Sequence, residues 1–291
     1  MTIDEKIIGM TTIINSASIT YNYTSQGSGF FYSEIAKEAT GPVGENGLGW
    51  HKVEGTWLIT NRHVAFPSIE QADGTKTETV PDVFVFNMRE VKNGKIEWVP
   101  IRLSKNELLA RTKLHPDPQV DVVAIKIDDL QIKLVTENTG RKIIGGIQLS
   151  NSNMPSPQQP TIEATTDVVI CSYPHGFYDK ENKFPIIKSG IISSSWGANF
   201  NGSPHFLVDA KLFPGSSGGL VISKPADVAM INGHLMHSKE KQYVFLGIYS
   251  GEYYYEKKEN GKVVLKEDYG LGIVWYSTLV PQIINNGMTY N

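Results

Sequence analysis

The sequence contains one cysteine, Cys171, among 291 residues, so no disulfide can form within the chain. Secreted proteins of this size often carry several disulfides, which form only in an oxidising compartment. Residues 1–15 also lack the basic start and the continuous apolar stretch of a secretory signal. We therefore expect a cytoplasmic protein in which Cys171, within an apolar run, is inert packing.

Positive charge is not in excess, since 27 lysines and arginines stand against 30 aspartates and glutamates, and no basic block occurs. A surface of this kind does not attract a phosphate backbone, so we expect no nucleic-acid partner. Apolar runs of about eighteen residues are also missing, and we expect no membrane-spanning helix. Hydrophobic residues make up 40% of the chain, which is ordinary for a globular protein.

Helical periodicity is scarce, whereas short runs rich in Val, Ile, Phe, Tyr and Thr alternate with turn residues along the chain. These runs predict strands at residues 18–23, 55–60, 83–87, 120–127, 167–171, 186–193, 205–210, 219–222, 243–249 and 270–275. Helices are expected only just after His63 and over residues 277–286. Turn residues predict loops at 33–49, 67–79 and 224–242, a turn at 92–95, and a hairpin tip at Asn260-Gly261.

Residues 150–160 (SNSNMPSPQQP) are polar and rich in proline, which is typical of a connector that crosses the surface. We expect this connector to divide the chain into an N-terminal domain, residues 1–150, and a C-terminal domain, residues 151–291. The length allows one large domain or two small ones.

The strongest chemical signal is the G-x-S-G-G run over residues 215–219, which follows the apolar segment 206–210. Glycines let a backbone turn tightly and bring its N–H groups close to a substrate, and the serine between them projects its hydroxyl into the same space. This loop predicts a nucleophilic serine, Ser217, beside backbone hydrogen-bond donors.

A serine hydroxyl at neutral pH needs a base to accept its proton, and histidine has a suitable pKa. Of the seven histidines, His63 has the most suitable setting, because residues 58–65 (LITNRHVA) read as an apolar strand that ends in a polar turn. A ring at such a place can be both exposed and rigidly held. His63 is therefore the candidate base.

The imidazole in turn needs a buried acceptor that fixes its tautomer and stabilises its charged form. Asp121 begins the apolar run DVVAIKI over residues 121–127, which would place its carboxylate at the edge of a strand. Asp117 and Asp209 are weaker alternatives.

These residues resemble the chymotrypsin-like serine peptidases, and most closely their bacterial trypsin-like and HtrA-like branches. The resemblance covers roughly residues 18–284 and depends on LITNRHVA, DVVAIKI and DAKLFPGSSGG (209–219), with support from GSGFF (27–31) and from YPHGFYDKENKFPIIKSGIIS (173–193). The order His, Asp, Ser matches this family, whereas subtilisins run Asp, His, Ser and α/β-hydrolases run Ser, Asp, His.

The resemblance implies an all-β fold of two six-stranded antiparallel β-barrels with a short C-terminal helix, and an active site between the barrels. It implies a serine endopeptidase in which Ser217 attacks, His63 transfers the proton and Asp121 orients His63. The backbone of Gly215, Ser216 and Ser217 would form the oxyanion hole. Protein or peptide substrates follow, with no cofactor and no metal, and a regulatory protein partner is compatible with this family.

Substrate-binding residues are carried over from the same resemblance. Lys211 lies six residues before Ser217, at the floor of the family's specificity pocket, where it would favour an acidic side chain; alternatively, it points outward and Leu212 with Tyr249 lines a pocket for small apolar residues. Ser250 and Gly251 resemble the segment that binds extended substrates, and Ser250 is also expected to contact Asp121. Ser216 replaces the aspartate of zymogen-activated members, which predicts a peptidase that needs no propeptide cleavage.

Other readings stay open at this point. The chain could keep the fold and the cleft and act as a catalytically idle binding module, or it could be an esterase-like hydrolase of another fold, which the chain order disfavours. His234 and His237 are interpreted as solvated loop residues rather than as a metal pair. His115, between prolines and Asp117, is interpreted as part of a rigid turn.

Overall fold

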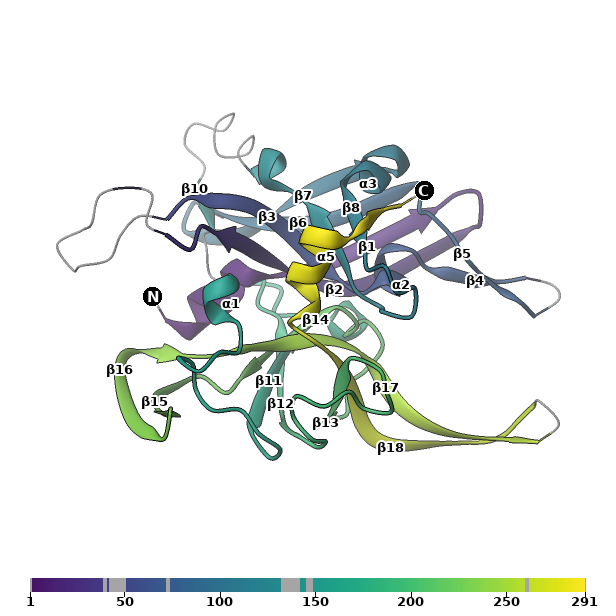
Figure 1. Ribbon diagram of the computed structural model, residues 1–291. Helices are drawn as coiled ribbons and strands as arrows, with labels where there is room; N and C mark the ends of the chain where they lie inside the picture. Colours follow the sequence, from purple (N-terminus) through teal and green to yellow (C-terminus); the bar gives the residue numbers. More distant parts are fainter. Residues whose placement is uncertain are drawn as a thin grey trace.

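The computed structural model describes residues 2–38, 41, 51–71, 74–131, 142–144, 149–259 and 262–290. Its C-terminal half contains a closed barrel of six antiparallel strands, in the order β11-β12-β13-β18-β17-β14 (Figure 1). These strands are β11 (Asp167–Ser172), β12 (Ile186–Ile192), β13 (His205–Asp209), β14 (Gly219–Ser223), β17 (Phe245–Glu259) and β18 (Lys262–Tyr276). The all-β class and the six-stranded C-terminal barrel are confirmed.

The N-terminal half differs from the expected six-stranded barrel, because it forms an antiparallel sheet of nine strands. They are β1 (Thr11–Ser18), β2 (Tyr23–Ile35), β3 (Val53–Thr60), β6 (Val83–Lys92), β7 (Lys95–Ser104), β8 (Thr112–Leu114), β9 (Val123–Lys126), β10 (Lys142–Ile144) and β19 (Met288–Thr289). The strand order is β10-β6-β1-β2-β3-β9-β8-β19, with β7 on β6, and no pairing between described strands closes this sheet. Two short strands, β10 and β19, form the two ends of this sheet.

One predicted strand and two predicted loops differ from the structure. The predicted strand at 18–23 is largely the turn between β1 and β2, because the Asp82 carboxylate accepts hydrogen bonds from the Ile19 N–H and the Ser18 hydroxyl there. Two predicted loops contain ribbons: β4 (Ser68–Glu70) with β5 (Lys76–Glu78), and β15 (Ala226–Ile231) with β16 (His234–Gln242). Their residues are mostly exposed on both faces, so these strands lack apolar alternation.

Left-handed backbone marks two of the hairpin turns. Asn93 and Gly94 connect β6 to β7 with φ of 50° and 76°, and Asn232 and Gly233 connect β15 to β16 with φ of 50° and 76°. Such Asn-Gly turns match the twist of the strands they join. The expected turn at 92–95 is confirmed, and the expected tip at Asn260-Gly261 lies outside the described residues.

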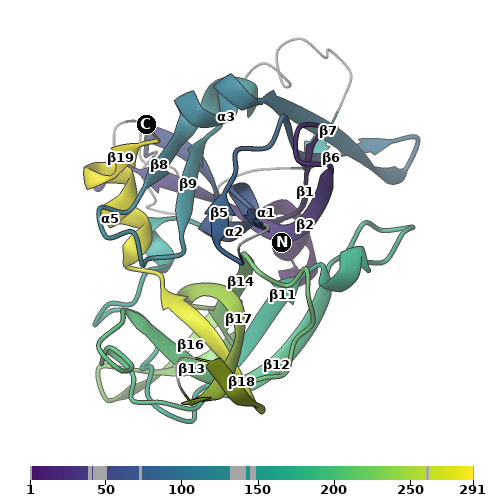
Figure 2. The ribbon, with the colours of Figure 1, turned by 90° about the vertical axis from the view of Figure 1, so that its right-hand side faces the viewer.

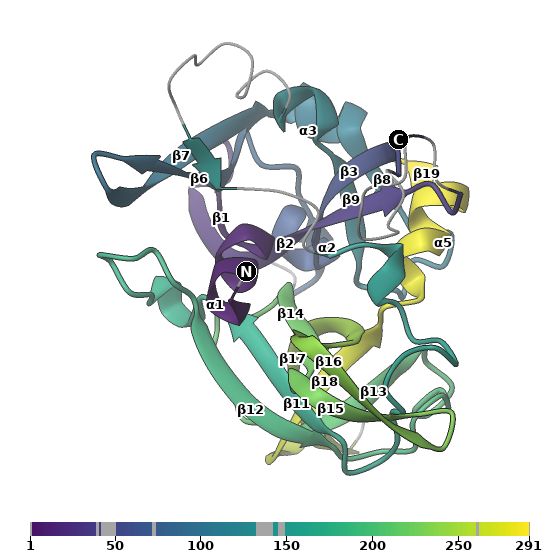
Figure 3. The same ribbon diagram turned by 90° about the vertical axis from the view of Figure 1, so that its left-hand side faces the viewer.

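Two helices were not expected. They are α1 (Ile3–Met10) and α3 (Lys105–Arg111), and each begins with a capping box, in which Thr2 pairs with Glu5 and Ser104 with Glu107. A threonine or serine followed three residues later by glutamate is a known start signal of helices, so the pattern was readable. Helix α1 lies at the seam between the two halves (Figure 3). No helix in the described part of the chain combines the length and the apolarity needed to cross a membrane.

The helix near the C-terminus, α5 (Leu279–Asn286), is present as expected but packs on the other half of the molecule. It contacts β8 and β9, and β19 pairs with β8 through Met288 and Leu114 (Figure 2). The chain therefore leaves the C-terminal barrel after β18 and returns to the N-terminal sheet. The connector at 150–160 begins with a single short turn, η1 (Asn151–Asn153).

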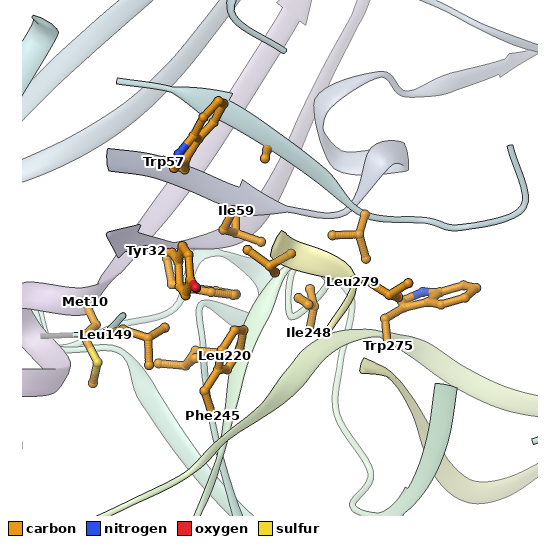
Figure 4. Close-up of a cluster of buried hydrophobic side chains, with 14 of the residues drawn as sticks. Met10, Tyr32, Trp57, Ile59, Leu149, Leu220, Phe245, Ile248, Trp275 and Leu279 are labelled. Atoms are coloured by element: carbon orange, nitrogen blue, oxygen red, sulfur yellow. The ribbon is translucent and has the colours of Figure 1, made fainter. Parts of the chain in front are cut away.

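Within the described part of the chain, buried apolar side chains form three clusters, and one of them fills the seam between the halves. This seam cluster includes Phe30 and Tyr32 of β2 and Leu220, Phe245 and Ile248 of the barrel. Figure 4 shows Tyr32 beside Leu220 and Phe245. The rings of Phe30 and Phe245 meet edge to face with centroids 5.4 Å apart, and both are fully buried. The other two clusters lie inside the N-terminal sheet and inside the C-terminal barrel.

Replacing Phe245 by alanine opens a cavity in the seam cluster, which should lower the free energy of unfolding by about 3–5 kcal/mol. The measurement is urea unfolding followed by tryptophan fluorescence. Leu235→Ala is the control, because Leu235 is 72% exposed on β16 and should change stability little. Equal effects of the two substitutions would contradict a seam that is held by apolar packing.

Candidate active site

His63 lies in a single turn of helix, α2 (Arg62–Ala65), directly after β3. Asn61 before it and Val64 and Ala65 after it are buried, so the backbone of the turn is anchored in the core. The side chain of His63 remains 47% exposed. The helix expected after His63 therefore contains His63, and it presents a ring that is fixed at its base and accessible at its end.

The Asp121 carboxylate lies just before β9 and contacts both halves of the molecule. Its Oδ1 accepts the backbone N–H of His63 at 3.0 Å, and its Oδ2 lies 2.7 Å from His63 Nδ1. The Ser250 hydroxyl of β17 donates to the same Oδ2 at 2.7 Å, so the expected contact between Ser250 and Asp121 is present. Asp121 therefore holds His63 by its backbone and by its ring.

The two alternative carboxylates make other contacts. Asp117 accepts the N–H of Gln119 at 2.9 Å, and this bond, together with one from the Asp117 N–H to His115 Nδ1, builds the turn expected there. Asp209 is an exposed residue of β13, paired in register with Ile191 and Leu271 of the C-terminal barrel. Only Asp121 contacts the His63 ring among the three.

The pKa of His63 is shifted in two directions. Partial burial lowers it, but the hydrogen bond that Nδ1 donates to Asp121 and the negative charge of Asp121 raise it, and the net result is a pKa above the ordinary value of 6.5. A carboxylate at Nδ1 holds the proton on that nitrogen and leaves Nε2 as the free base of the neutral ring. Because the pKa is raised by folding, protonated His63 stabilises the fold at low pH, and this stabilisation is lost as the pH rises through the folded pKa.

Ser217 lies in the loop between β13 and β14, where two glycines adopt left-handed backbone, Gly215 at φ +90° and Gly218 at φ +82°. A Cβ on Gly218 would collide with the carbonyl oxygen of Ser28, so glycine is required there for steric reasons as well. The Ser217 hydroxyl donates to the carbonyl oxygen of Ser250 at 2.7 Å. It does not hydrogen-bond to His63 in this structure.

Some backbone N–H groups of this loop donate hydrogen bonds to other described residues, and others do not. The N–H of Ser216 donates to the Phe213 carbonyl at 3.0 Å, and that of Gly219 donates to the Ser216 carbonyl. Ser216 is therefore not available as an oxyanion donor, which corrects the expectation that it contributes. The N–H groups of Gly215 and Ser217 have no acceptor among the described residues.

Ser28 of β2 connects this loop to the N-terminal sheet. Its N–H donates to the Ser217 carbonyl at 2.8 Å, and its hydroxyl donates to the Gly215 carbonyl at 2.8 Å. The same hydroxyl accepts the N–H of Tyr173 at 2.9 Å. Ser28 is fully buried, so these bonds are protected from water and fix the residues on either side of Ser216.

Tyr173 carries this network on to a buried arginine. Its hydroxyl accepts a hydrogen bond from Arg89 Nη2 at 2.5 Å, and Arg89 also donates to the carbonyl oxygens of Ile8, Thr11 and Lys183. Arg89 is 1% exposed and lies 4.3 Å over the Trp98 ring, and its burial lowers its pKa. Among the described residues, all acceptors of this guanidinium are neutral, and it ties the end of α1 to the segment beside Gly215.

Asn61 is a site residue that the sequence reasoning missed. Its side-chain amide donates to the Asp121 carbonyl at 2.6 Å, and its side-chain oxygen accepts the N–H of Gly218 at 2.6 Å. It is fully buried and links the Asp121 segment to the Ser217 loop directly. The available signal was a polar residue that is enclosed by the apolar segments 57–59 and 64–66.

The residues expected to bind substrate lie in different environments, and only some of them lie beside Ser217. Lys211 points outward: its side chain is 59% exposed and its Nζ lies 2.7 Å from the Asp268 carboxylate, which raises the pKa of Lys211. Leu212 and Tyr249 are 1% and 2% exposed in the barrel core, so they do not line an open pocket. Ser250 and Gly251 are only partly buried, beside Ser217.

His234, His237 and Cys171 form no second site with other described residues. His234 and His237 stand three residues apart on β16, which places them on opposite faces of the strand. Among the described residues, no three His, Cys, Asp or Glu side chains gather as a metal ion would require. Burial raises the pKa of Cys171 to about 12, so its thiol stays protonated.

Removing the charge of Asp121 should lower the pKa of His63. In wild type, the NMR titration midpoint of the His63 ring is expected above 6.5, and in Asp121→Asn it should fall because the raising interaction is lost while burial remains. Asp117→Asn is the control and should leave the midpoint unchanged. Equal midpoints in wild type and Asp121→Asn would show that this carboxylate does not govern the ring.

Replacing Ser28 by alanine should leave the Gly215 carbonyl and the Tyr173 N–H without their buried partner. The expected loss of unfolding free energy is about 1–3 kcal/mol, measured by urea denaturation. Ser25→Ala is the same chemical change on the same strand, at a hydroxyl that makes no hydrogen bond within the described chain, and should have little effect. A neutral Ser28→Ala would mean that the loop is held by other contacts.

Comparison with known proteins places this geometry in a family. A sequence model described as a trypsin-like peptidase domain matches residues 27–228. Among curated proteins, none matches the chain in sequence. Two solved structures resemble it: the Rv3671c protease of M. tuberculosis in its active form, at 14% identity and a TM-score of 0.41 over 98% of this chain and 83% of that chain, and the protease Anisep of Arthrobacter nicotinovorans, at 12% identity and a TM-score of 0.45 over 97% of this chain and 96% of that chain. Because the matched segment spans more than half of the sequence, the chain belongs to the trypsin-like peptidase family.

Proposed function

We propose that the protein is a serine endopeptidase that cleaves peptide bonds with His63, Asp121 and Ser217 as its catalytic residues. The observation that carries this proposal is the Asp121 carboxylate, which lies 2.7 Å from His63 Nδ1 and accepts the Ser250 hydroxyl beside the nucleophile loop. Membership of the trypsin-like peptidase family supports protein or peptide substrates. The Gly-rich loop around Ser217 and the free N–H groups of that loop support acyl transfer.

The proposed reaction begins with a rotation of the Ser217 side chain about χ1. This rotation releases the hydroxyl from the Ser250 carbonyl and turns it toward His63 Nε2, which accepts its proton. The serine oxygen attacks the scissile carbonyl carbon, the tetrahedral intermediate collapses, and the leaving amine takes the proton from His63. Water, deprotonated by His63, then hydrolyses the acyl-enzyme and restores the Ser217 hydroxyl.

Charge develops at two places during these steps, and a different set of groups would stabilise the charge at each place. The N–H groups of Gly215 and Ser217 would donate to the oxyanion, because Ser28 holds the carbonyls of the same two residues away from it. Asp121 would stabilise the imidazolium of His63 through Nδ1. The raised pKa of His63 makes its neutral ring a stronger base. Activity should rise with pH as His63 loses its proton, with a midpoint above pH 6.5.

The proposed primary specificity is for a small apolar side chain. Leu212 and the Tyr249 ring occupy the barrel core beside the nucleophile loop, and the Tyr249 ring packs against Gly272, so little room remains for a large side chain. Lys211 would take no part in binding this side chain, because its charge is paired with Asp268. Ser250 and Gly251 would hydrogen-bond the substrate backbone.

A second candidate is a catalytically idle binding module with the same fold. The Ser217 hydroxyl favours this candidate, since it is bonded to the Ser250 carbonyl and not to His63. The two candidates differ in one property, the reactivity of Ser217 toward an acylating or phosphonylating reagent.

A fluorophosphonate probe should label wild-type protein at Ser217, and tandem mass spectrometry of the labelled peptide locates the adduct. Ser217→Ala should abolish labelling and lower peptidase activity by a factor on the order of 10⁶, and Asp121→Asn should lower kcat by ~10⁴. Ser216→Ala, at the neighbouring buried serine, is the control and should still be labelled. An unlabelled wild type would support the idle module, and an adduct on another residue would overturn the assignment of the nucleophile.

A further inference from the structure

A cavity of about 270 Å³ opens beside the candidate base, on the N-terminal half of the molecule. We call it the His63 cavity, and its lining includes His63, Asp121, Arg62, Glu78, Phe66 and Pro118. Leu212 and Tyr249, which lie in the core of the C-terminal barrel, take no part in this lining. The His63 cavity is therefore distinct from the proposed pocket for a small apolar side chain.

An ion pair between Arg62 and Glu78 lies in the wall of the His63 cavity. Arg62 Nε donates to Glu78 Oε2 at 2.7 Å, and Arg62 Nη2 donates to Glu78 Oε1 at 3.0 Å. Two parallel bonds of this kind fix a guanidinium and a carboxylate in one geometry. The two side chains are 23% and 28% exposed, so each keeps a part that a ligand can reach.

Tyr290, which follows β19, also holds Glu78. Its hydroxyl donates to Glu78 Oε1 at 2.8 Å, and its ring lies on the ring of Phe66 with centroids 4.4 Å apart. Burial and the hydrogen bond to Glu78 raise the pKa of Tyr290 to about 12, so the hydroxyl keeps its proton and remains a donor. Phe66 in turn donates its N–H to the Arg62 carbonyl at 2.7 Å. Glu78 is thus fixed by partners on α2 and after β19.

The ion pair keeps one donor and one acceptor for a ligand. Arg62 uses Nε and Nη2 on Glu78, and within the described chain its Nη1 has no acceptor. A carboxylate offers about four acceptor sites, and Glu78 uses three of them, on Arg62 and Tyr290. A primary amide presents a carbonyl oxygen and an NH₂ group side by side, which match this donor and this acceptor.

Other kinds of side chain match the cavity less well. The ion pair has no net charge, and Asp121, the other carboxylate in the lining, is already bonded to His63 and Ser250. A carboxylate in the cavity would be repelled by Glu78 and Asp121, and an ammonium group would be repelled by Arg62. An apolar side chain would displace water from the ion pair without replacing its hydrogen bonds.

We propose that the His63 cavity binds the primary amide side chain of a glutamine or asparagine close to the scissile bond, with Arg62 as donor and Glu78 as acceptor. Tyr290 is a positioning residue, because it acts through Glu78. This inference rests on the proposed peptidase function and adds a second determinant of specificity. The occupant is close to the cleaved bond, because the cavity shares His63 with the catalytic residues.

The test starts from the peptide around the strongest cleavage site of β-casein, an unfolded protein. Glutamine, glutamate, lysine or methionine is placed at one position at a time, from three residues before the cut to three after it, and kcat/KM is measured for each peptide. These four side chains are similar in length and differ in charge and polarity. In wild type, glutamine should be favoured about tenfold over the other three at one position.

Removing either member of the ion pair should change this preference in opposite directions. Glu78→Gln leaves Arg62 unpaired, so glutamate should become the preferred residue at that position by about tenfold. Arg62→Gln leaves Glu78 unpaired, so lysine should become the preferred residue there. The double variant Arg62→Gln, Glu78→Gln should favour neither charge. Opposite changes of this kind do not follow from a general loss of folding.

Tyr290→Phe keeps the ring on Phe66 and removes only the hydrogen bond to Glu78. The preference for glutamine should fall about threefold, mainly through KM. Tyr269→Phe is the matched control and should keep the preference, because Tyr269 is 53% exposed on β18 and its hydroxyl makes no hydrogen bond within the described chain. An unchanged preference in Tyr290→Phe would overturn the role of Tyr290.

Two results would overturn the site itself. One is a wild type that does not favour glutamine at any position, and the other is a preference that changes in the same direction in Glu78→Gln and Arg62→Gln.

Failure of the proposed function would look different from failure of this inference. If no peptide is cleaved, and Ser217 is not labelled by a fluorophosphonate, the peptidase assignment and the inference that rests on it both fall. If the peptides are cleaved and cleavage is lost in Ser217→Ala, the peptidase assignment holds, and the side-chain series alone decides the role of the His63 cavity.

Discussion

One carboxylate holds the two halves of the site together. Asp121 belongs to the N-terminal half, but its Oδ2 is shared by His63 Nδ1 and by the Ser250 hydroxyl of the C-terminal barrel, each at 2.7 Å. Ser250 in turn accepts the Ser217 hydroxyl through its carbonyl. The proposed base and nucleophile are thus both placed by one shared contact, and a shift between the halves would disturb both at once.

The geometry of this contact depends on how the two halves pack at the seam around it. Apolar packing in the seam cluster, which includes Phe30 against Phe245, holds the halves together, and hydrogen bonds of Ser28 and Asn61 fix the Ser217 loop at this seam. Arg89 extends the same framework to α1 through hydrogen bonds to backbone carbonyls and to the Tyr173 hydroxyl. The loop around Ser217 is therefore held in place by the folded chain itself.

Much of the site was predictable because its residues carry local signals. His63 follows an apolar strand, Asp121 precedes one, and the glycines around Ser217 are required by a backbone that no other residue adopts easily. Strands with a buried face were also predictable, since apolar side chains recur along them. The exposed ribbon β15–β16 was not, because neither of its faces is buried and no periodicity marks it.

Features that depend on distant partners could not be predicted in the same way. The sequence left two orientations open for Lys211, and its pairing with Asp268 on β18 places it outward. Likewise, α5 and β19 follow the C-terminal barrel in sequence and pack on the N-terminal sheet in space. The capping boxes of α1 and α3 are different, because their signal was local and was overlooked.

The central claim is that His63, oriented by Asp121, deprotonates Ser217. Its most direct test is the second-order rate constant for phosphonylation of Ser217, measured against pH and compared with the NMR titration of the His63 ring, since this requires no knowledge of the natural substrate. The account predicts a rate that rises as His63 loses its proton, with one midpoint above 6.5 that coincides with the NMR midpoint. A rate that does not change through this pH range, or a midpoint that differs from that of His63, would contradict it.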